Sequence, residues 1–204
     1  VAIPHLIHAL LNDEDTVVQA SAIGALARIG IASVTPLLEV LASPNSSESN
    51  KGHAAWGLAF IGAPAKDKLY TAYNCDSPAV RAAVVGAIAK IAQEDRHDTQ
   101  SLNLLVNALK DTVADVRSEA AAVLGNLKYQ PAIPTLLDLL HHPEAETRQS
   151  AALSLMKIGD RQSIPALQTA LDQESDLQTS KAINLAVSLL QKQVDSPPDN
   201  DWIE

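Results

Sequence analysis

Aromatic residues are scarce in this sequence: Phe, Trp and Tyr make up 3% of its 204 residues, although hydrophobic residues as a class make up 47%. A core of that extent must therefore consist mainly of Ala, Leu, Ile and Val. The single cysteine, Cys75, excludes an internal disulfide framework and a cysteine-rich metal site, and it is typical of a reducing compartment. We therefore expect a cytoplasmic protein without a metal centre.

Long apolar runs and excess positive charge are also lacking. No apolar run approaches the roughly 20 residues that cross a membrane, and the sequence does not open on a basic-then-apolar leader. The formal net charge is −9, whereas nucleic acids and anionic membranes bind clustered positive charge. We expect no nucleic-acid partner and no membrane insertion. The sequence opens at Val1 inside a helical pattern and without an initiator Met, which is consistent with an N-terminal truncation.

One helical phrase occurs six times, about every 31 residues. It reads VVQASAIGALARIG at 17–30, and its other copies occupy 49–62, 79–92, 115–128, 146–159 and 178–191. A second helical segment precedes each copy. In several of these segments a Pro lies in the first turn, which tolerates a missing N–H. Three copies end in Gly, as a helix C-terminus with a left-handed backbone favours; these are Gly30, Gly62 and Gly159. Each unit is thus a predicted helix pair.

Aligned copies show apolar columns at helical spacing. One column holds Leu26, Leu58, Ile88, Leu124, Leu155 and Val187, and another, three residues further on, holds Ile29, Ile61, Ile91, Leu127, Ile158 and Leu190. A column of mostly small residues completes the stripe with Ala22, Ala54, Val84, Ala120, Ala151 and Ile183. A lone helix pair cannot bury such a face, so the copies must stack. We predict an all-α fold, a right-handed α-solenoid of six helix pairs over residues 1–192.

The copies resemble a known repeat. AIPTLLDLLHHPEAETRQSAALSLMKIGD, at 132–160, resembles a short HEAT repeat: Pro134 opens the unit, Thr147–Arg148 starts the second helix and Ile-Gly closes it. Val80–Arg81 and Val116–Arg117 match the same signature. The short, Ala-rich form is similar to the HEAT-like repeats of the phycobilisome lyase type. In that family the repeats assist the attachment or removal of linear tetrapyrroles (bilins) on phycobiliproteins in cyanobacteria. The resemblance covers about residues 2–191.

The second copy carries an unusual aromatic stripe. His53, Trp56 and Phe60 replace residues that are mostly polar or small in the other copies, and Gly24 and Gly86 flank Trp56 in its own column. Large apolar groups on a wet face commonly mark a contact surface. We therefore expect a concave patch of His53, Trp56 and Phe60 that binds a partner. The alternative is that Trp56 fills the space left by the two glycines as a core residue.

Cations also repeat in one column, as Lys51, Arg81, Arg117 and Arg148. One interpretation is a structural ladder in which each cation pairs with a carboxylate of the preceding turn, such as Asp76, Asp111 or Glu144. The other is a ridge that binds the carboxylates of a ligand or partner through Arg forks. Cys75, in a turn before a helix, is a minor candidate for a reactive thiol.

The last residues break the pattern. From residue 193 onward the chain carries four acids and no Lys or Arg, and Pro197 and Pro198 interrupt the helical periodicity. We predict an acidic, disordered tail over 193–204, with Trp202 as its one bulky aromatic residue.

No nucleophilic, acid–base or metal constellation emerges from the sequence, so whether the protein is an enzyme stays open and its catalytic residues are unknown. The resemblance implies a protein-binding factor that assists bilin attachment or phycobiliprotein assembly. It also implies a bilin as a transient ligand, no permanent cofactor, and a phycobiliprotein, lyase co-subunit or assembly factor as the partner. The alternative is a non-enzymatic scaffold for another assembly pathway, such as iron–sulfur cluster delivery.

Overall fold

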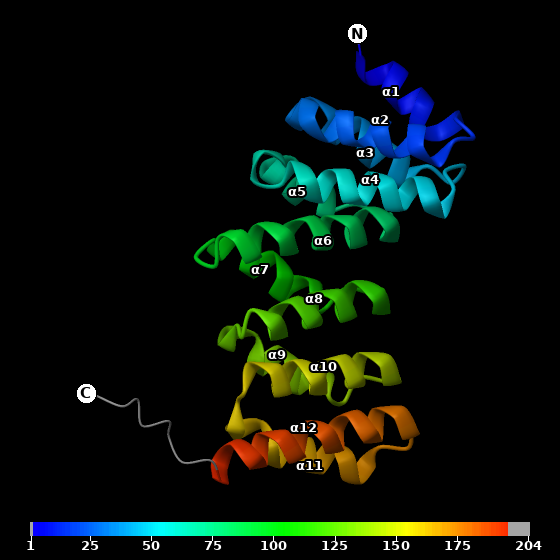
Figure 1. Cartoon of the computed structure of the whole chain (residues 1–204). Helices are drawn as coiled ribbons and strands as arrows, with labels where there is room; N and C mark the ends of the chain where they lie inside the picture. The colour runs from blue at the N-terminus through cyan, green and yellow to red at the C-terminus, as the bar shows by residue number, and fades with distance from the viewer. Residues whose placement is uncertain (1, 196–204) are drawn as a thin grey trace. The chain divides into compact units, whose positions relative to one another are not determined.

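Helices account for every regular element of the part of the chain that the structure describes, residues 2–195. This computed structural model contains twelve α-helices and four short 3-10 helices in that range, drawn in Figure 1. The α-helices are α1 Ala2–Asn12, α2 Thr16–Ile29, α3 Val34–Ala42, α4 Glu48–Ile61, α5 Lys66–Tyr73, α6 Pro78–Glu94, α7 Thr99–Ala108, α8 Ala114–Asn126, α9 Ile133–Leu139, α10 Ala145–Ile158, α11 Ile164–Gln173 and α12 Leu177–Asp195. The 3-10 helices are η1 Gly30–Ser33, η2 Ala63–Ala65, η3 Gln130–Ala132 and η4 Arg161–Ser163.

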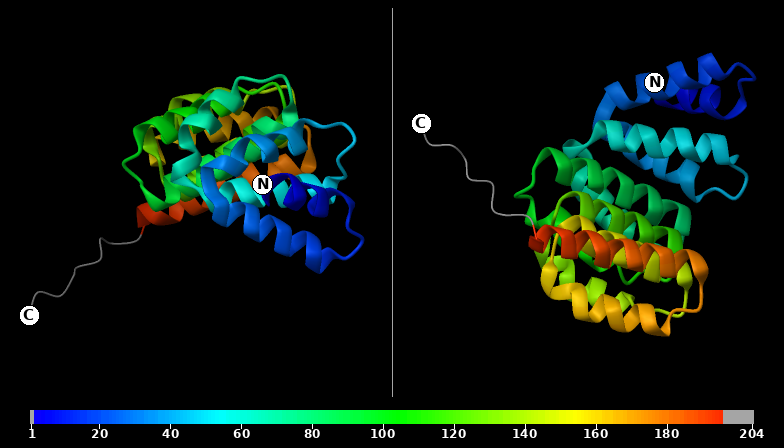
Figure 2. Two further views of the ribbon diagram at one scale, coloured as in Figure 1. Left: turned by 90° about the horizontal axis from the view of Figure 1, so that it is seen from above. Right: turned by 60° about the horizontal axis from the view of Figure 1, so that its bottom comes forward.

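The helices form two compact units, Val1–Glu119 and Ala120–Glu204. In the first unit the second helices of successive repeats, α2, α4 and α6, pack side by side, and α1, α3 and α5 pack behind them, as Figures 1 and 2 show. In the second unit α9 packs on α10, and α10 and α11 pack on α12. The predicted all-α solenoid of stacked helix pairs is confirmed.

The predicted apolar columns form the core. Leu26, Leu58 and Ile88 are fully buried, as are their counterparts in α8 and α10. Each such side chain contributes roughly 1.5–3 kcal/mol to folding. Another small residue of α4 allows close approach: a Cβ built on Gly57 would lie 2.6 Å from Ile23 Cδ1. Glycine at position 57 therefore sets the separation between α4 and α2 at this point.

The first repeat departs from the predicted burial. Ile29 is 40% exposed, whereas Leu190, its counterpart in the last repeat, is fully buried. Val18 and Thr179, in another column, show the same contrast. The preceding repeat therefore covers these columns, and no described helix precedes α1. The prediction that all six members of the Ile29 column are buried is wrong for Ile29 for this reason, and it is also wrong for Leu127, which is half-buried.

The helix ends follow the predicted turn chemistry. Gly30, Gly62 and Gly159 all have positive φ, at 79°, 62° and 81°, a region that glycine enters without a Cβ penalty. Lys128 takes the equivalent place in the fourth repeat and adopts φ 53°. It is the one described residue other than glycine with a positive φ.

Two segments of the structure bear on predictions that stay open. Helix α12 extends to Asp195, three residues into the segment 193–204 that we predicted as a tail; residues 196–204, including Trp202, lie outside the described residues. The stretch Thr16–Ala42 is long and apolar enough to pass as a membrane span by length and composition, contrary to our reading of the apolar runs. In the structure Gly30 and η1 divide it into α2 and α3. The absence of membrane insertion stays a prediction.

Candidate functional site

The side chains of the aromatic stripe lie together on α4. Ser47 caps this helix by accepting a hydrogen bond from the backbone N–H of Asn50. Trp56 is 50% exposed and Phe60 is 60% exposed. Their rings stack with centroids 5.3 Å apart and an interplanar angle of 29°, a favourable aromatic geometry. His53 lies one turn before them and is half-buried. These three residues are the α4 face.

The core interpretation of Trp56 is wrong. A Cβ built on Gly24 or on Gly86 meets no atom within 4 Å, so the indole does not fill the space beside either glycine. Since half of the Trp56 side chain faces solvent, it also contributes less to the core than a buried Trp would. That Trp56 and Phe60 bind a partner is not tested by their exposure and stays a hypothesis.

The half-buried His53 carries an unusual atom. Its Nδ1 is buried and has no hydrogen-bond partner among residues 2–195. The side-chain oxygen of the buried Asn50, in the turn before it, also has none there. Asn50 is thus enclosed at the polar start of α4, in a column that holds Val80 in α6 and Val116 in α8. The alignment shows a polar residue where most copies carry an apolar one, but it does not show that this residue is buried.

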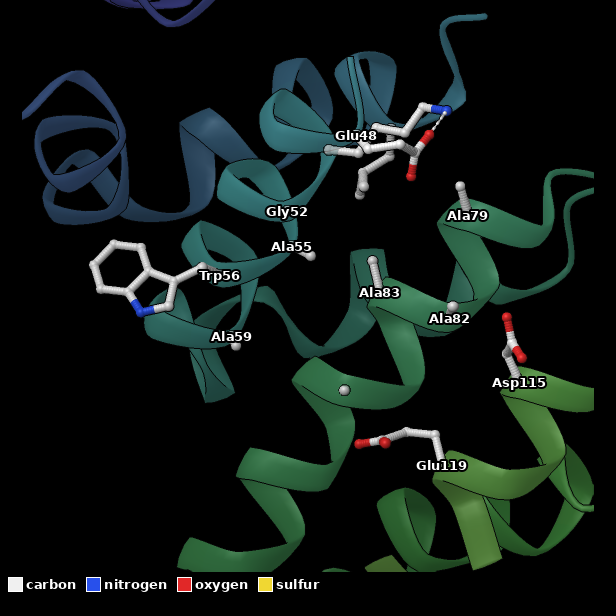
Figure 3. Close-up of a pocket in the computed structure, with 13 residues that line it drawn as sticks. Glu48, Gly52, Ala55, Trp56, Ala59, Ala79, Ala82, Ala83, Asp115 and Glu119 are labelled. Carbon is white, nitrogen blue, oxygen red and sulfur yellow. Dashed lines mark hydrogen bonds and ion pairs between the residues drawn. The ribbon is translucent and has the colours of Figure 1, made fainter. Parts of the chain in front are cut away.

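An apolar groove lies beside α4. It has a volume of about 590 Å³ and runs between α4 and α6 toward the start of α8. Its floor consists of residues with no side chain beyond Cβ, including Ala55, Ala59, Ala82, Ala83 and Gly86. Figure 3 shows Ala55 and Ala59 on the α4 wall, and the Trp56 indole at the edge, projecting away from α6. The two columns that hold His53 and Trp56 in α4 hold Ala83 and Gly86 in α6, which keeps this groove open.

Charged side chains border the groove. Asp115 and Glu119 stand one turn apart on α8 and line it from that side, as Figure 3 shows. Glu48 and Lys51, at the start of α4, form an ion pair of 2.9 Å and therefore add no net charge. Sequence reasoning missed this groove and its two acids, because alanine columns read as ordinary helix-packing positions.

The arginines form the ladder, with different partners from those predicted. Arg81 holds Asp111 through two hydrogen bonds, from Nε at 2.8 Å and from Nη2 at 2.9 Å. Arg148 holds Glu174 in the same way, with both bonds at 2.7 Å. Each carboxylate belongs to the turn of the next repeat, not to the preceding turn. Bidentate pairs of this kind are strong and directional.

The same column also fastens its own turn. Arg81, Arg117 and Arg148 each donate from Nη1 to a backbone carbonyl six residues earlier, at Cys75, Asp111 and His142. Gln19 does the same to the carbonyl of Asp13. Arg117 is buried, and Lys51 reaches Glu48 instead. A ligand carboxylate would have to displace these partners, so the ridge of Lys51, Arg81, Arg117 and Arg148 acts first as a structural device.

The ion pairs set the protonation of their carboxylates. Burial raises the pKa of Asp111, but the hydrogen bonds from Arg81 and from the Val113 N–H outweigh burial and lower it. The Arg148 hydrogen bond lowers the pKa of Glu174. Tyr73 donates to Asp111 at 3.2 Å, and burial together with that carboxylate raises the pKa of Tyr73 to about 12. Both carboxylates are therefore ionised near neutral pH.

The remaining candidate groups do not assemble into a reaction centre. Cys75 is half-buried, and its thiol points to the Ser77 carbonyl at 3.7 Å. Its reactivity stays a prediction. Among residues 2–195 no group of three or more His, Cys, Asp or Glu side chains is arranged to hold a metal ion.

Comparison with known proteins identifies relatives. The chain is 37% identical over 161 residues to the bilin biosynthesis protein MpeU of Synechococcus sp. (strain WH8020), covering 78% of this chain and 54% of the relative. It is 41% identical over 81 residues to the phycocyanobilin lyase subunit alpha of Picosynechococcus sp. (strain ATCC 27264 / PCC 7002 / PR-6), covering 36% of this chain and 30% of that relative. The chain thus spans about half the length of the first relative and less than a third of the second.

A solved structure shows the same fold. The complex of CpcE and CpcF of phycocyanin lyase from Nostoc sp. PCC7120 contains a chain that superimposes with a TM-score of 0.64 at 23% identity, covering 76% of this chain and 98% of that chain. The expected similarity to lyase-type repeat proteins is confirmed by these relatives. Residues 3–89, 66–144 and 102–188 each match HEAT repeats. These overlapping matches extend over most of the chain, which belongs to the HEAT-repeat family.

Proposed function

We propose that this protein assists bilin attachment or phycobiliprotein assembly, as a protein-binding factor that holds its partner against the α4 face. The observation that carries the proposal is the stacked, solvent-facing pair of Trp56 and Phe60, in a chain whose relatives are named for bilin biosynthesis and phycocyanobilin lyase. The relatives do not favour an iron–sulfur delivery scaffold. The partner would be a phycobiliprotein or a lyase co-subunit, and the site of action the cytoplasm.

The chemistry of the α4 face suits this role. Two stacked rings offer a flat apolar surface on which a conjugated tetrapyrrole or an aromatic side chain of the partner can stack. Aromatic residues of this kind commonly dominate binding energy at interfaces. The bilin would be a transient ligand in transit to the partner. Asp111 and Glu174 already occupy the forks of Arg81 and Arg148, so contact through the rings is the main expected interaction.

A pigment assay tests the proposal. The full chain is mixed with phycocyanobilin and an apo-phycobiliprotein subunit, and both the absorption spectrum and the pigment that stays on the denatured subunit are measured. We expect a spectral change and more attached pigment than without the protein. The double variant W56A/F60A should lower the effect about tenfold, the loss expected for central aromatic contacts.

The last repeat provides a matched control. Leu185 and Leu189 occupy the Trp56 and Phe60 columns in α12 and are 47% and 38% exposed. The variant L185A/L189A should therefore behave as the wild type. An unchanged pigment spectrum together with no capture of the phycobiliprotein subunit would contradict the proposed function. If W56A/F60A and L185A/L189A lower pigment attachment equally, the α4 face is not the site of the proposed function.

A further inference from the structure

The floor of the groove between α4 and α6 can accept another helix closely. Ala55, Ala59 and Ala82 present only methyl groups, and Gly86 presents none. A Cβ built on Gly86 meets no atom within 4 Å, so free space remains above the floor. Helix-in-groove recognition uses a recess of this kind, in which an apolar helix face is laid between two supporting helices. The shape alone does not select a partner.

The charge at the α8 side of the groove does select one. Asp115 and Glu119 are exposed, and within residues 2–195 the carboxylate of neither takes part in an ion pair or a hydrogen bond. The nearby Lys51 is engaged by Glu48. An acid in the first turn of a helix is favoured by the helix dipole, which accounts for Asp115. Glu119 lies beyond that turn, so the dipole does not account for the second uncompensated charge.

We infer that this groove docks a positively charged amphipathic helix of a partner protein, with its small apolar side chains on the alanine floor and a Lys or Arg between Asp115 and Glu119. The two carboxylates would repel an anionic ligand such as a bilin propionate, so the groove and the α4 face have different occupants. The inference deepens the proposed function, and rests on it, in that it names the chemistry of the partner segment held beside the α4 face.

Peptide binding without pigment tests the inference. The probe is a fluorescein-labelled synthetic helix with an Ala and Leu face and lysines four residues apart, and its counterpart carries Glu in place of Lys. Fluorescence anisotropy with the full chain should show that the Lys peptide binds at least tenfold more tightly. The variant D115N/E119Q should weaken the Lys peptide about three- to tenfold, as expected for two exposed ion pairs.

Matched variants separate the groove from general effects. D138N/E146Q removes two exposed acids elsewhere and should leave the affinity close to that of the wild type. G86F places a ring in the groove and should weaken the Lys peptide at least tenfold, whereas G24F, at an equally open glycine of α2, should not. Circular dichroism confirms that both glycine variants stay helical.

Two results would overturn the inference: equal binding of the Lys and Glu peptides, or wild-type affinity in both D115N/E119Q and G86F. Because no pigment is present, the peptide assay can fail while the pigment assay succeeds, which would remove the inference and leave the proposed function. Conversely, peptide binding without any effect on the pigment or the phycobiliprotein would contradict the proposed function and leave the docking groove in place.

Discussion

At the scale of single residues, Trp56 shows how sibling repeats inform about exposure. A lone helical segment with Trp and Phe four residues apart fits a core as well as a surface. The aligned copies carry Gly24 and Gly86 beside Trp56, and Arg28 and Lys90 beside Phe60, which indicates a wet edge. The exposure of both rings follows that pattern.

We expect W56A to change stability little. The side chain is half exposed and loses mainly its stacking on Phe60, so the free energy of unfolding should fall by no more than about 1 kcal/mol. A buried Trp would lose about 3–5 kcal/mol. Urea denaturation followed by circular dichroism measures the difference. L58A, at a fully buried position of the same helix, should lose about 2–5 kcal/mol and serves as the positive control.

At Lys128 the backbone conformation decides how a substitution changes the free energy of unfolding. Its φ of 53° costs an ordinary side chain about 1 kcal/mol, whereas glycine enters this region freely. We therefore expect K128G to leave the free energy of unfolding unchanged or to raise it by up to about 1 kcal/mol. K90G, inside α6, should lower it by about 1 kcal/mol, because glycine is a poor helix former. Destabilisation by K128G equal to that by K90G would show that the strain is not released.

At the scale of helices, the sequence predicted the pairing device but not its partner. Arg117 lies six residues after Asp111 and Arg81 lies 30 residues before it, and a one-dimensional alignment favours the nearer residue. In the structure the Asp111 carbonyl accepts from Arg117, while its carboxylate accepts from Arg81. The choice depends on how the turn of one repeat lies against the helix of the previous one.

Removing Asp111 should therefore be costly. Its side chain is 4% exposed and that of Arg81 is 12% exposed, so D111A leaves a nearly buried guanidinium unpaired. We expect the free energy of unfolding at neutral pH to fall by about 3 kcal/mol, measured by urea denaturation. E94Q, which breaks the exposed Lys90–Glu94 pair, should cost less than about 1 kcal/mol.

The same ion pair predicts a pH dependence. The pKa of Asp111 is lowered in the folded protein from an unfolded value of about 3.9. The stabilisation is therefore complete above about pH 4 and is lost as the pH falls through the lower folded value. The difference in the free energy of unfolding between wild type and D111A should therefore become smaller as the pH falls over that acid range. If that difference does not depend on pH, the stability lost in D111A comes from packing rather than from charge.

The groove could not be predicted from the sequence, although its helices could. The periodicity fixed which helix faces are apolar, and the structure places those faces in the core. Ala55, Ala59 and Ala82 fit a tightly packed contact or an open recess equally well, because alanine is small in both. Only the separation of the α4 and α6 backbones distinguishes the two cases, and no sequence pattern encodes it.

At the scale of the whole molecule, the net charge of −9 should speed the approach of a basic partner. Long-range attraction raises association rates and is screened by salt. We expect the association rate of the Lys peptide to fall about fivefold or more between 0.01 M and 0.15 M salt, measured by stopped-flow fluorescence.

The two charge variants separate this effect from docking. D115N/E119Q and D138N/E146Q change the net charge equally, so both should slow association to a similar extent. Dissociation should quicken only in D115N/E119Q, because only that variant changes the groove. An association rate that does not change with salt would contradict long-range attraction of the peptide by the net charge.

Arg81 and Arg148 each pair with a carboxylate of the following repeat, and this direction matters while the chain is being synthesised. Arg81 precedes Asp111 by 30 residues, and Arg148 precedes Glu174 by 26. As the ribosome releases the polypeptide from its amino end, each guanidinium emerges well before its counter-ion. A nascent repeat is thus completed only by the arrival of its successor. Expression fragments should accordingly end after a turn carboxylate, since a fragment that ends before one leaves the arginine of its last complete repeat without a counter-ion.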